Sequence, residues 1–262
     1  MGDTTKETPL RAALESGVLT LTLNRPERLN AMSQELIGMI IEQLDRALAE
    51  SEVRAVLITG TGRGFCAGQD LKEIQSGERG FDEILNGYVT AISRIVELDK
   101  PVIAAVNGVA AGGGANLALA CDIVLAARSA RFDQAFVRIA LLPDLGGTWF
   151  LPHIVGDARA RALGMQGTPV SAEEAERTGM IWQAVDDSKL MAEATALARQ
   201  LAAGPTLSYG AIKRAIDAAA TNTLDQQLDL ERDSQRALGQ SADFKEGVAA
   251  FLAKRPAQFT GR

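Results

Sequence analysis

The chain has 262 residues, of which 47% are hydrophobic, and 27 basic residues stand against 33 acidic ones. This composition supports a large hydrophobic core and argues against a disordered chain. The net charge of −6 gives no general basic surface for nucleic acid, so any anionic ligand must be held by a local site. We therefore expect one large α/β domain, or a core with an appendage.

Residue types that carry catalysis or cross-links are scarce. Two cysteines, Cys66 and Cys121, are too few for a disulfide framework or a Cys-based zinc site, which indicates a reducing compartment. The N-terminus lacks the apolar run of a signal peptide, and no stretch approaches 18 uncharged apolar residues. We expect a soluble, cytoplasmic protein without a membrane segment. The single histidine, His153, excludes a His-rich metal site, and we interpret it as structural because no serine nucleophile motif lies nearby.

The hydrophobic pattern along residues 17–185 predicts alternating strands and helices. Ser33 and Ser171 stand where N-caps of helices are expected. The predicted strands cover residues 17–24, 53–59, 102–106, 122–127 and 182–185. The predicted helices cover residues 33–50, 81–98, 115–120, 157–165 and 171–179, with a further helical piece from Asp70. Residues 60–68 and 141–149 are predicted loops, and residues 1–15 a frayed or edge-pairing start.

From Asp187 onward the pattern is helical throughout, over residues 188–203, 206–220, 223–239 and 241–253. Pro205 and Asn222 mark breaks between these helices. Strands and helices followed by a helical tail predict an α/β fold with an all-α extension. We divide the chain into a core of residues 1–200 and a helical domain of residues 201–262, whose apolar faces suit subunit packing.

The most informative stretch is 101–122, PVIAAVNGVAAGGGANLALACD. A buried strand, Val102–Val106, is followed by three glycines and then by a helix over residues 115–120. Glycines at the first turn of a helix let a ligand approach bare N–H groups at the positive end of the helix dipole. Such a turn can hold an anion, or a carbonyl oxygen that becomes one. The alternative is a glycine-rich junction needed only for close packing.

A second small-residue turn, FCAGQDL over residues 65–71, follows the buried strand 53–59. It can offer one exposed N–H, at Gln69, and the Gly113 N–H can offer another at the neighbouring strand end. Two N–H donors that converge on one oxygen form an oxyanion hole. Nucleotide motifs fail by contrast, since the third glycine of Gly60–Gly64 comes one position early and residues 108–114 lack the P-loop lysine.

Three long motifs, FCAGQDL, AVNGVAAGGGANLALACDIVLAA and LLPDLGGTWFLP, resemble the crotonase (enoyl-CoA hydratase/isomerase) superfamily. The resemblance covers essentially the whole chain, from GVLTLTLNRPERLNAM to GVAAFLAKRPAQF. GRGFCAGQDL, GMIWQ, NTLDQQLDLERD and AFLAKRPAQFTG are similar in particular to the subgroup of 2-(1,2-epoxy-1,2-dihydrophenyl)acetyl-CoA isomerases of phenylacetate degradation. The resemblance implies a crotonase-like spiral of ββα turns with an all-α C-terminal trimerisation domain, assembled as a homotrimer or a dimer of trimers.

The resemblance also implies an acyl-CoA thioester substrate, and no cofactor beyond its CoA moiety. The thioester carbonyl would sit between the N–H groups of Gln69 and Gly113. Family members bind CoA along two loops and through a basic pair that reaches a neighbouring subunit's CoA phosphates. The matching positions here are Arg25, Arg28, Leu29, Ala31, Cys66, Ala67 and Lys254. Without the resemblance, each of these charges reads as a solvated surface residue.

Acidic residues at the positions that match the family's catalytic carboxylates distinguish its members. Hydratases of the family use two glutamates, and the matching positions hold Asn116 and Phe136. An amide and a phenyl ring cannot perform the proton transfers of hydration. Asp144 matches an aspartate of dienoyl-CoA and epoxyphenylacetyl-CoA isomerases, and apolar neighbours are expected to raise its pKa. Its alternative role is that of a turn aspartate capping the next segment.

These residues lead to an isomerase hypothesis, in which Asp144 removes a proton beside the thioester carbonyl and the two amides hold the enolate. Three alternatives remain open. They are a general enoyl-CoA isomerase or hydratase of fatty-acid oxidation, a dehalogenase-like enzyme with Asp144 as nucleophile, and a non-catalytic acyl-CoA-binding protein. We interpret Asp70 as a helix cap that fixes the oxyanion turn, and Asp122 and Asp133 as structural.

Overall fold

A six-stranded sheet forms the larger layer of the α/β part, in the order β1-β2-β3-β5-β7-β10. The computed structural model describes residues 8–76 and 80–262. The strands are β1 (Leu10–Glu15), β2 (Val18–Leu23), β3 (Ala55–Gly60), β5 (Val102–Val106), β7 (Ile123–Ala127) and β10 (Gln183–Val185). β1 pairs antiparallel with β2, and every later pair is parallel. β5 is buried along its whole length, as its β-branched run predicts.

A second sheet of very short strands lies at the ends of the first, in the order β4-β6-β8-β9. Its members are β4 (Gly64–Cys66), β6 (Val109–Ala111), β8 (Arg131–Asp133) and β9 (Val170–Ser171). β3, β5 and β7 each turn directly into one of these short strands before a helical segment follows, so a ββα unit repeats. This is the expected spiral of ββα turns. The prediction of an uninterrupted loop over 60–68 was wrong, because a three-residue strand is too short to show alternation in the sequence.

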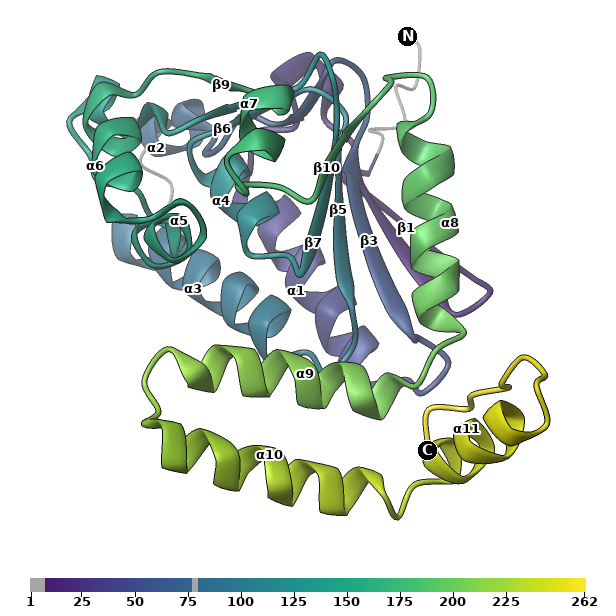
Figure 1. The fold of residues 1–262 in the computed structure, drawn as a ribbon. Helices are drawn as coiled ribbons and strands as arrows, with labels where there is room; N and C mark the ends of the chain where they lie inside the picture. Colours follow the sequence, from purple (N-terminus) through teal and green to yellow (C-terminus); the bar gives the residue numbers. More distant parts are fainter. Residues whose placement is uncertain (1–7, 77–79) are drawn as a thin grey trace, which may run out of the picture.

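Helices cover both faces of the larger sheet. Figure 1 shows α1 (Gln34–Ala49) and α3 (Phe81–Glu97) on one face and α8 (Leu190–Ala202) on the other. The Ser33 hydroxyl accepts the Leu36 N–H at 3.2 Å, which confirms the expected N-cap of α1. The remaining helical segments of the α/β part are η1 (Pro26–Arg28), α2 (Leu71–Ser76), α4 (Gly113–Leu119), η2 (Ala135–Ile139), α5 (Gly147–Val155), α6 (Asp157–Gln166) and α7 (Ala172–Arg177).

α5 begins inside the predicted loop 141–149. Gly146 precedes it in the left-handed region, at φ 74°, and Gly147 is its first residue. Glycine has low helix propensity, so a helix that opens on two glycines is hidden from sequence patterns. Tertiary packing sets this boundary.

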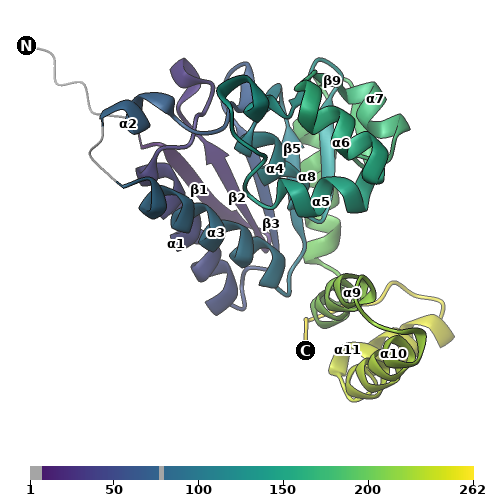
Figure 2. The same ribbon diagram turned by 90° about the vertical axis from the view of Figure 1, so that its left-hand side faces the viewer.

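Three C-terminal helices extend away from the sheets, α9 (Thr206–Ala219), α10 (Leu224–Leu238) and α11 (Ala242–Leu252). Figures 1 and 2 show them as a separate layer below the larger sheet. Lys213 of α9 pairs with Asp122 at 2.9 Å, and this ion pair fastens the layer to the turn before β7. No helix within the described residues is long and apolar enough to cross a membrane.

Candidate active site

The glycine turn between β6 and α4 is built for close approach. Gly112 adopts φ 53°, and its N–H donates to the Asp133 carbonyl at 2.7 Å. A Cβ on Gly114 would overlap the Cys66 carbonyl oxygen, so glycine lets α4 pack directly onto β4. Gly113 is the first residue of α4, so its N–H has no acceptor within the helix. The turn therefore presents the Gly113 amide at the N-terminus of the helix.

Backbone pairing sets the direction of the Gln69 N–H. Met32 and Gln69 form a parallel bridge, in which the Met32 N–H donates to Gly68 O at 2.7 Å and Asp70 N–H donates to Met32 O at 3.0 Å. In a parallel bridge of this kind Met32 uses the residues flanking Gln69, so the N–H of Gln69 itself faces away from Met32.

The other side of Gln69 is the start of α4. Gly68 lies so close to it that a Cβ there would be 2.8 Å from Ala111 O and 3.3 Å from the Gly113 nitrogen. Gly68 also has φ 86°, a conformation that favours glycine. The structure thus brings the two turns side by side, and the N–H of Gln69 faces away from Met32.

An internal ion pair holds the Gln69 turn from behind. Arg25 Nη2 lies 2.7 Å from Asp70 Oδ2, and Arg25 Nη1 donates to the Ala31 carbonyl. Asp70 Oδ1 also accepts the Lys72 N–H at 3.2 Å, which agrees with its expected position as a cap. Burial alone would raise the pKa of Asp70, but the hydrogen bond and charge of Arg25 lower it. The guanidinium of Arg25 therefore binds Asp70 and the Ala31 carbonyl beside the turn.

Asp144 lies next to the Gly113 amide. Its Oδ1 is 3.5 Å from the position that a Cβ on Gly113 would take. The same Oδ1 is buried and has no hydrogen-bond partner in the part of the chain that the structure describes. Burial raises the pKa of Asp144 to about 6, as its apolar surroundings predict. The site therefore holds one carboxylate beside the first residue of α4. Its pKa lies near neutral pH, which suits a general base.

Asn116 positions the loop that carries Asp144. The Asn116 amide nitrogen donates to the Asp144 carbonyl at 2.8 Å, and its Oδ1 accepts from Gln134 Nε2 at 2.8 Å. Gly147 is required opposite, because a Cβ there would overlap the Asn116 amide. The sequence showed only that Asn116 lacks a carboxylate. Its positioning function, and the part of Gln134, were missed because both depend on contacts between distant segments.

Phe136 forms an apolar wall at the same turn. Its ring carbons lie 3.8 and 4.0 Å from the position of a Cβ on Gly112, and the residue is 6% exposed. Asn116 is fully buried. Neither position that matches a hydratase glutamate contributes a carboxylate. The acids that we interpreted as structural are paired elsewhere, Asp133 with Arg138 at 2.8 Å and Asp122 with Lys213.

The residues expected along CoA fall into two groups. Most of them line the η1 loop and β4, close to the Gln69 turn, where the Ala67 N–H donates to Leu29 O at 2.9 Å. Of this group Arg28 is exposed, Leu29 and Ala67 are half-buried, and Ala31 and Cys66 are buried. Lys254 is exposed directly after α11, which Figure 1 places away from α4. A single protomer therefore does not bring Lys254 to the two amides.

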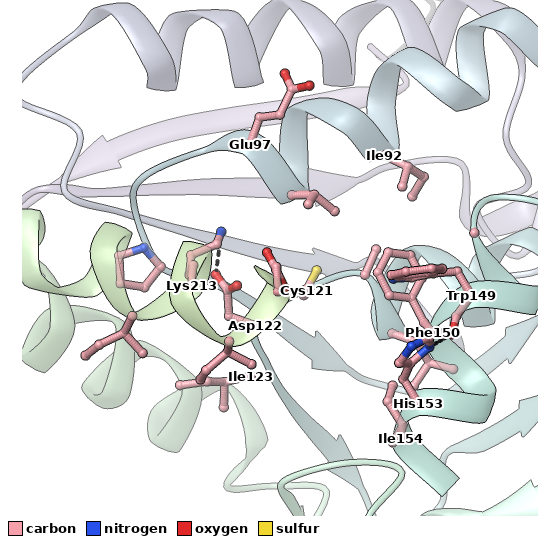
Figure 3. A pocket seen from close by; sticks show the side chains of 18 of the residues that line it. Ile92, Glu97, Cys121, Asp122, Ile123, Trp149, Phe150, His153, Ile154 and Lys213 are labelled. Atoms are coloured by element: carbon pink, nitrogen blue, oxygen red, sulfur yellow. Dashed lines mark hydrogen bonds and ion pairs between the residues drawn. The ribbon is translucent and has the colours of Figure 1, made fainter. Parts of the chain in front are cut away.

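A cavity of about 890 Å³ lies at the opposite end of α4, between α3, α5 and α9. Figure 3 shows the Asp122–Lys213 ion pair on one of its walls and the Trp149 and His153 rings, in contact and tilted to each other, on another. His153 Nδ1 is 2.6 Å from the Trp149 carbonyl oxygen, and burial raises the pKa of the Cys121 thiol. Lys213 and Asp122 pair with each other on its wall. The lining includes Gly146, two residues after Asp144, so the cavity extends to the loop that carries Asp144.

Comparisons with known proteins agree with this architecture. The family described as Enoyl-CoA hydratase/isomerase matches residues 13–262. The chain is 54% identical over 254 residues to the 1,2-epoxyphenylacetyl-CoA isomerase of Escherichia coli K12, covering 95% of this chain and 97% of that protein. It is 47% identical to a probable enoyl-CoA hydratase of Rhodobacter capsulatus, covering 97% and 98%.

Solved structures give the same result. A putative enoyl-CoA hydratase from Streptomyces coelicolor A3(2) superposes with a TM-score of 0.92 at 36% identity, covering 100% of this chain and 98% of that one. An enoyl-CoA hydratase from Polaromonas sp. JS666 gives 0.90 at 38% identity, covering 95% and 99%. The sequence, the ββα spiral and the paired turns agree, and the chain belongs to the enoyl-CoA hydratase/isomerase family of the crotonase superfamily.

Proposed function

We propose that this protein is an acyl-CoA isomerase that acts through a thioester enolate, with 1,2-epoxyphenylacetyl-CoA of phenylacetate degradation as its substrate. The observation that carries the proposal is the position of Asp144, whose Oδ1 is buried and unpaired within the described residues and lies beside the Gly113 amide. The 54% identical relative named for this reaction supports the choice of acyl group.

In the proposed reaction, the Asp144 carboxylate removes a proton from the carbon next to the thioester carbonyl. The electron pair of that C–H bond forms a double bond to the carbonyl carbon, the π pair of the carbonyl moves onto its oxygen, and the N–H groups of Gln69 and Gly113 stabilise the enolate oxygen. Each such donor typically contributes about 2.7–4 kcal/mol to lowering the barrier. The ring C–C bond that the epoxide oxygen bridges then breaks, its electron pair joins the conjugated double bonds of the seven-membered oxepin, and the Asp144 carboxylic acid returns the proton to a ring carbon.

The environment of Asp144 suits a base for this step. A carboxylate with a pKa of about 6 is a stronger base than a solvated aspartate, yet it is still mostly ionised at neutral pH. Its unpaired Oδ1 is free to accept the proton. The CoA moiety belongs to the substrate, and the η1 loop with Cys66 and Ala67 is proposed to bind it in the same subunit.

A general enoyl-CoA isomerase or hydratase of fatty-acid oxidation is the second candidate, since a 47% identical relative is named as a probable hydratase. Hydration needs groups that hold and activate water. Here the Asn116 amide nitrogen donates to the Asp144 carbonyl, and Phe136 is a buried phenyl ring. Neither side chain can activate water. Crotonyl-CoA hydration measured beside 3-enoyl-CoA isomerisation separates the two candidates.

The substitution Asp144→Asn tests the proposal directly. It removes the base and keeps the size of the side chain, so turnover of 1,2-epoxyphenylacetyl-CoA is expected to fall about 10²–10⁴-fold. Affinity for a non-reacting phenylacetyl-CoA, measured by calorimetry, is expected to persist. Asp157→Asn, at an exposed carboxylate of α6, is the matched control. Normal turnover by Asp144→Asn would remove Asp144 from the mechanism.

The proposal extends to assembly and location, with a cytoplasmic homotrimer or dimer of trimers. The helices of residues 201–262 would form the trimerisation domain, and Lys254 would reach the CoA of a neighbouring subunit. Support comes from large apolar side chains that these helices expose, among them Ile216 at 68%, Leu224 at 73% and Phe251 at 83%. Sedimentation analysis tests the assembly, and a monomer at micromolar concentration would contradict it.

A further inference from the structure

Leu145 follows Asp144 in a backbone conformation that leucine rarely adopts. It has φ 47°, and the next residue, Gly146, is also left-handed at φ 74°. In this region the Cβ of a residue other than glycine lies too close to the following carbonyl oxygen. Such strain persists where the surrounding structure requires it, and it is found often at functional sites. The turn after the proposed base therefore holds a leucine where the backbone favours glycine or asparagine.

The Leu145 side chain lies at the glycine turn that carries the oxyanion amide. Leu145 is 6% exposed, and its Cδ1 lies 2.9 Å from the position that a Cβ on Gly113 would take. Met32 Cε lies 2.8 Å from the same position, and Asp144 Oδ1 lies 3.5 Å from it. A methyl group from each of two hydrophobic side chains thus meets the carboxylate beside the first residue of α4.

Hydrogen bonds fix the main chain of Asp144, whereas packing places its carboxylate. The Asn116 side-chain amide and the Gly147 N–H both donate to the Asp144 carbonyl oxygen at 2.8 Å. The carboxylate Oδ1 has no hydrogen-bond partner among the residues that the structure describes. Its place beside Gly113 is therefore set by the atoms that pack around it, and Leu145 supplies one of them from the adjacent position in the chain.

Met32 connects this packing to the second amide of the site. It is fully buried, its main chain forms the bridge with Gln69, and its Cε borders the Gly113 turn. The carboxylate, the Leu145 methyl and the residue that holds the Gln69 turn therefore meet at one place. A shift of the Leu145 side chain would change the separation between the carboxylate and the Gly113 amide, and proton removal with enolate stabilisation depends on that separation.

We infer that Leu145 is a positioning residue, whose side chain packs against Gly113 and holds the Asp144 carboxylate beside the oxyanion amide. The inference deepens the proposed function and rests on it, because Asp144 is the base of that reaction. The contact with Gly113 offsets the left-handed strain of Leu145, so the turn keeps its conformation only while the side chain is present. Asp144 moves the proton, and Leu145 acts only through it.

Leu145→Ala tests the inference, because alanine keeps the strain and loses the contact with Gly113. The reaction to follow is the exchange of the α-protons of phenylacetyl-CoA for deuterium in heavy water, which needs the base and the amides but no ring rearrangement. The exchange rate at saturating ligand is expected to fall about 10²-fold, the effect of misplacing a catalytic group by about 1 Å, while the calorimetric affinity stays within about threefold. An unchanged exchange rate would overturn the inference.

Two further variants separate positioning from a general loss of stability. Leu145→Met keeps an unbranched hydrophobic side chain of similar volume, so its exchange rate is expected to lie within about threefold of the unaltered rate. Leu190→Ala truncates another buried leucine, on α8 at the other face of the larger sheet, and is expected to lower the melting temperature without slowing exchange. If Leu190→Ala slows exchange as much as Leu145→Ala does, or if Leu145→Met is equally slow, the inference is wrong.

Crystal structures test the inference without any turnover. In Leu145→Ala the Asp144 carboxylate is expected to lie about 1 Å or more from its place beside Gly113, and in Leu145→Met it is expected to stay there. An unmoved carboxylate in Leu145→Ala would overturn the inference. If the unaltered protein exchanges α-protons but does not isomerise the ring epoxide, the proposed substrate is wrong and the exchange comparison still decides the case of Leu145. If it catalyses neither reaction, the proposed function fails, and the crystal structures decide that case.

Discussion

Asp144→Asn is expected to make the protein more stable at neutral pH while it lowers turnover about 10²–10⁴-fold. The carboxylate is buried beside Gly113 without a partner for Oδ1 among the described residues, so the folded state carries a charge that it solvates poorly. The asparagine side chain has the same size and no charge. The loop keeps its geometry, because Asn116 and the Gly147 N–H bind the main-chain oxygen of Asp144 at 2.8 Å each.

The magnitude follows from the pKa of Asp144, which burial raises from 3.8 to about 6. At 1.36 kcal/mol per pKa unit, the shift corresponds to about 3 kcal/mol, and partial exposure of the side chain reduces the expected value to about 2 kcal/mol. Near pH 3 and below, the carboxyl is protonated in both states, so its charge does not lower the stability of the folded state. Between pH 4 and 6 the unfolded state loses its proton first, and the stability of the unaltered protein falls relative to the variant. Above pH 6 the difference is constant.

Thermal unfolding at equal protein concentration, from pH 3 to pH 8, measures this difference. The variant is expected to unfold about 4–8 °C above the unaltered protein at pH 8 and at the same temperature near pH 3. Asp157→Asn, at an exposed carboxylate, is expected to show no such pH-dependent gap. A variant that is less stable than the unaltered protein at pH 8 would refute the reasoning, because Asp144 would then have a stabilising partner in the folded protein.

Three further predictions concern the same site. The kcat/KM for isomerisation is expected to rise tenfold per pH unit below about pH 6 and to level off above it, since Asp144 must be ionised to act as base; a profile flat from pH 5 to 7 would contradict this. Asn116→Asp is expected to shift the acidic side of this pH profile to higher pH, because it places a second negative charge beside Asp144 and removes the donor to its carbonyl. An unchanged pH profile would show that Asn116 does not act on Asp144. Gly68→Ala is expected to lower the free energy of unfolding by about 1–2 kcal/mol, because Gly68 has a left-handed φ. It is also expected to reduce turnover, because the new Cβ would lie 2.8 Å from Ala111 O. Chemical denaturation and steady-state rates measure the two effects, and full activity would argue against the oxyanion turn.

Local sequence signals determined the elements and the turns of this protein. Alternation and apolar runs predict β2 and β5, and hydroxyl residues mark helix starts, as the Ser33 and Ser171 caps confirm. The glycine turn at 112–114 could also be identified, because few residues other than glycine suit a bare helix N-terminus after a buried strand. The sequence pattern did not predict the short strands β4, β6 and β8, because three residues are too few to show alternation.

Only the tertiary structure decided the geometry of the site. The Met32 bridge turns the Gln69 N–H away from Met32, and the two bridged residues are 37 positions apart in the chain. Asp144 gains its raised pKa from burial beside Gly113, and Asn116 gains its function from a carbonyl 28 residues away. Sequence specifies local backbone preference, because that preference depends on neighbouring residues. Burial, charge environment and amide direction depend on which distant segments pack together, and they exist only in the folded chain.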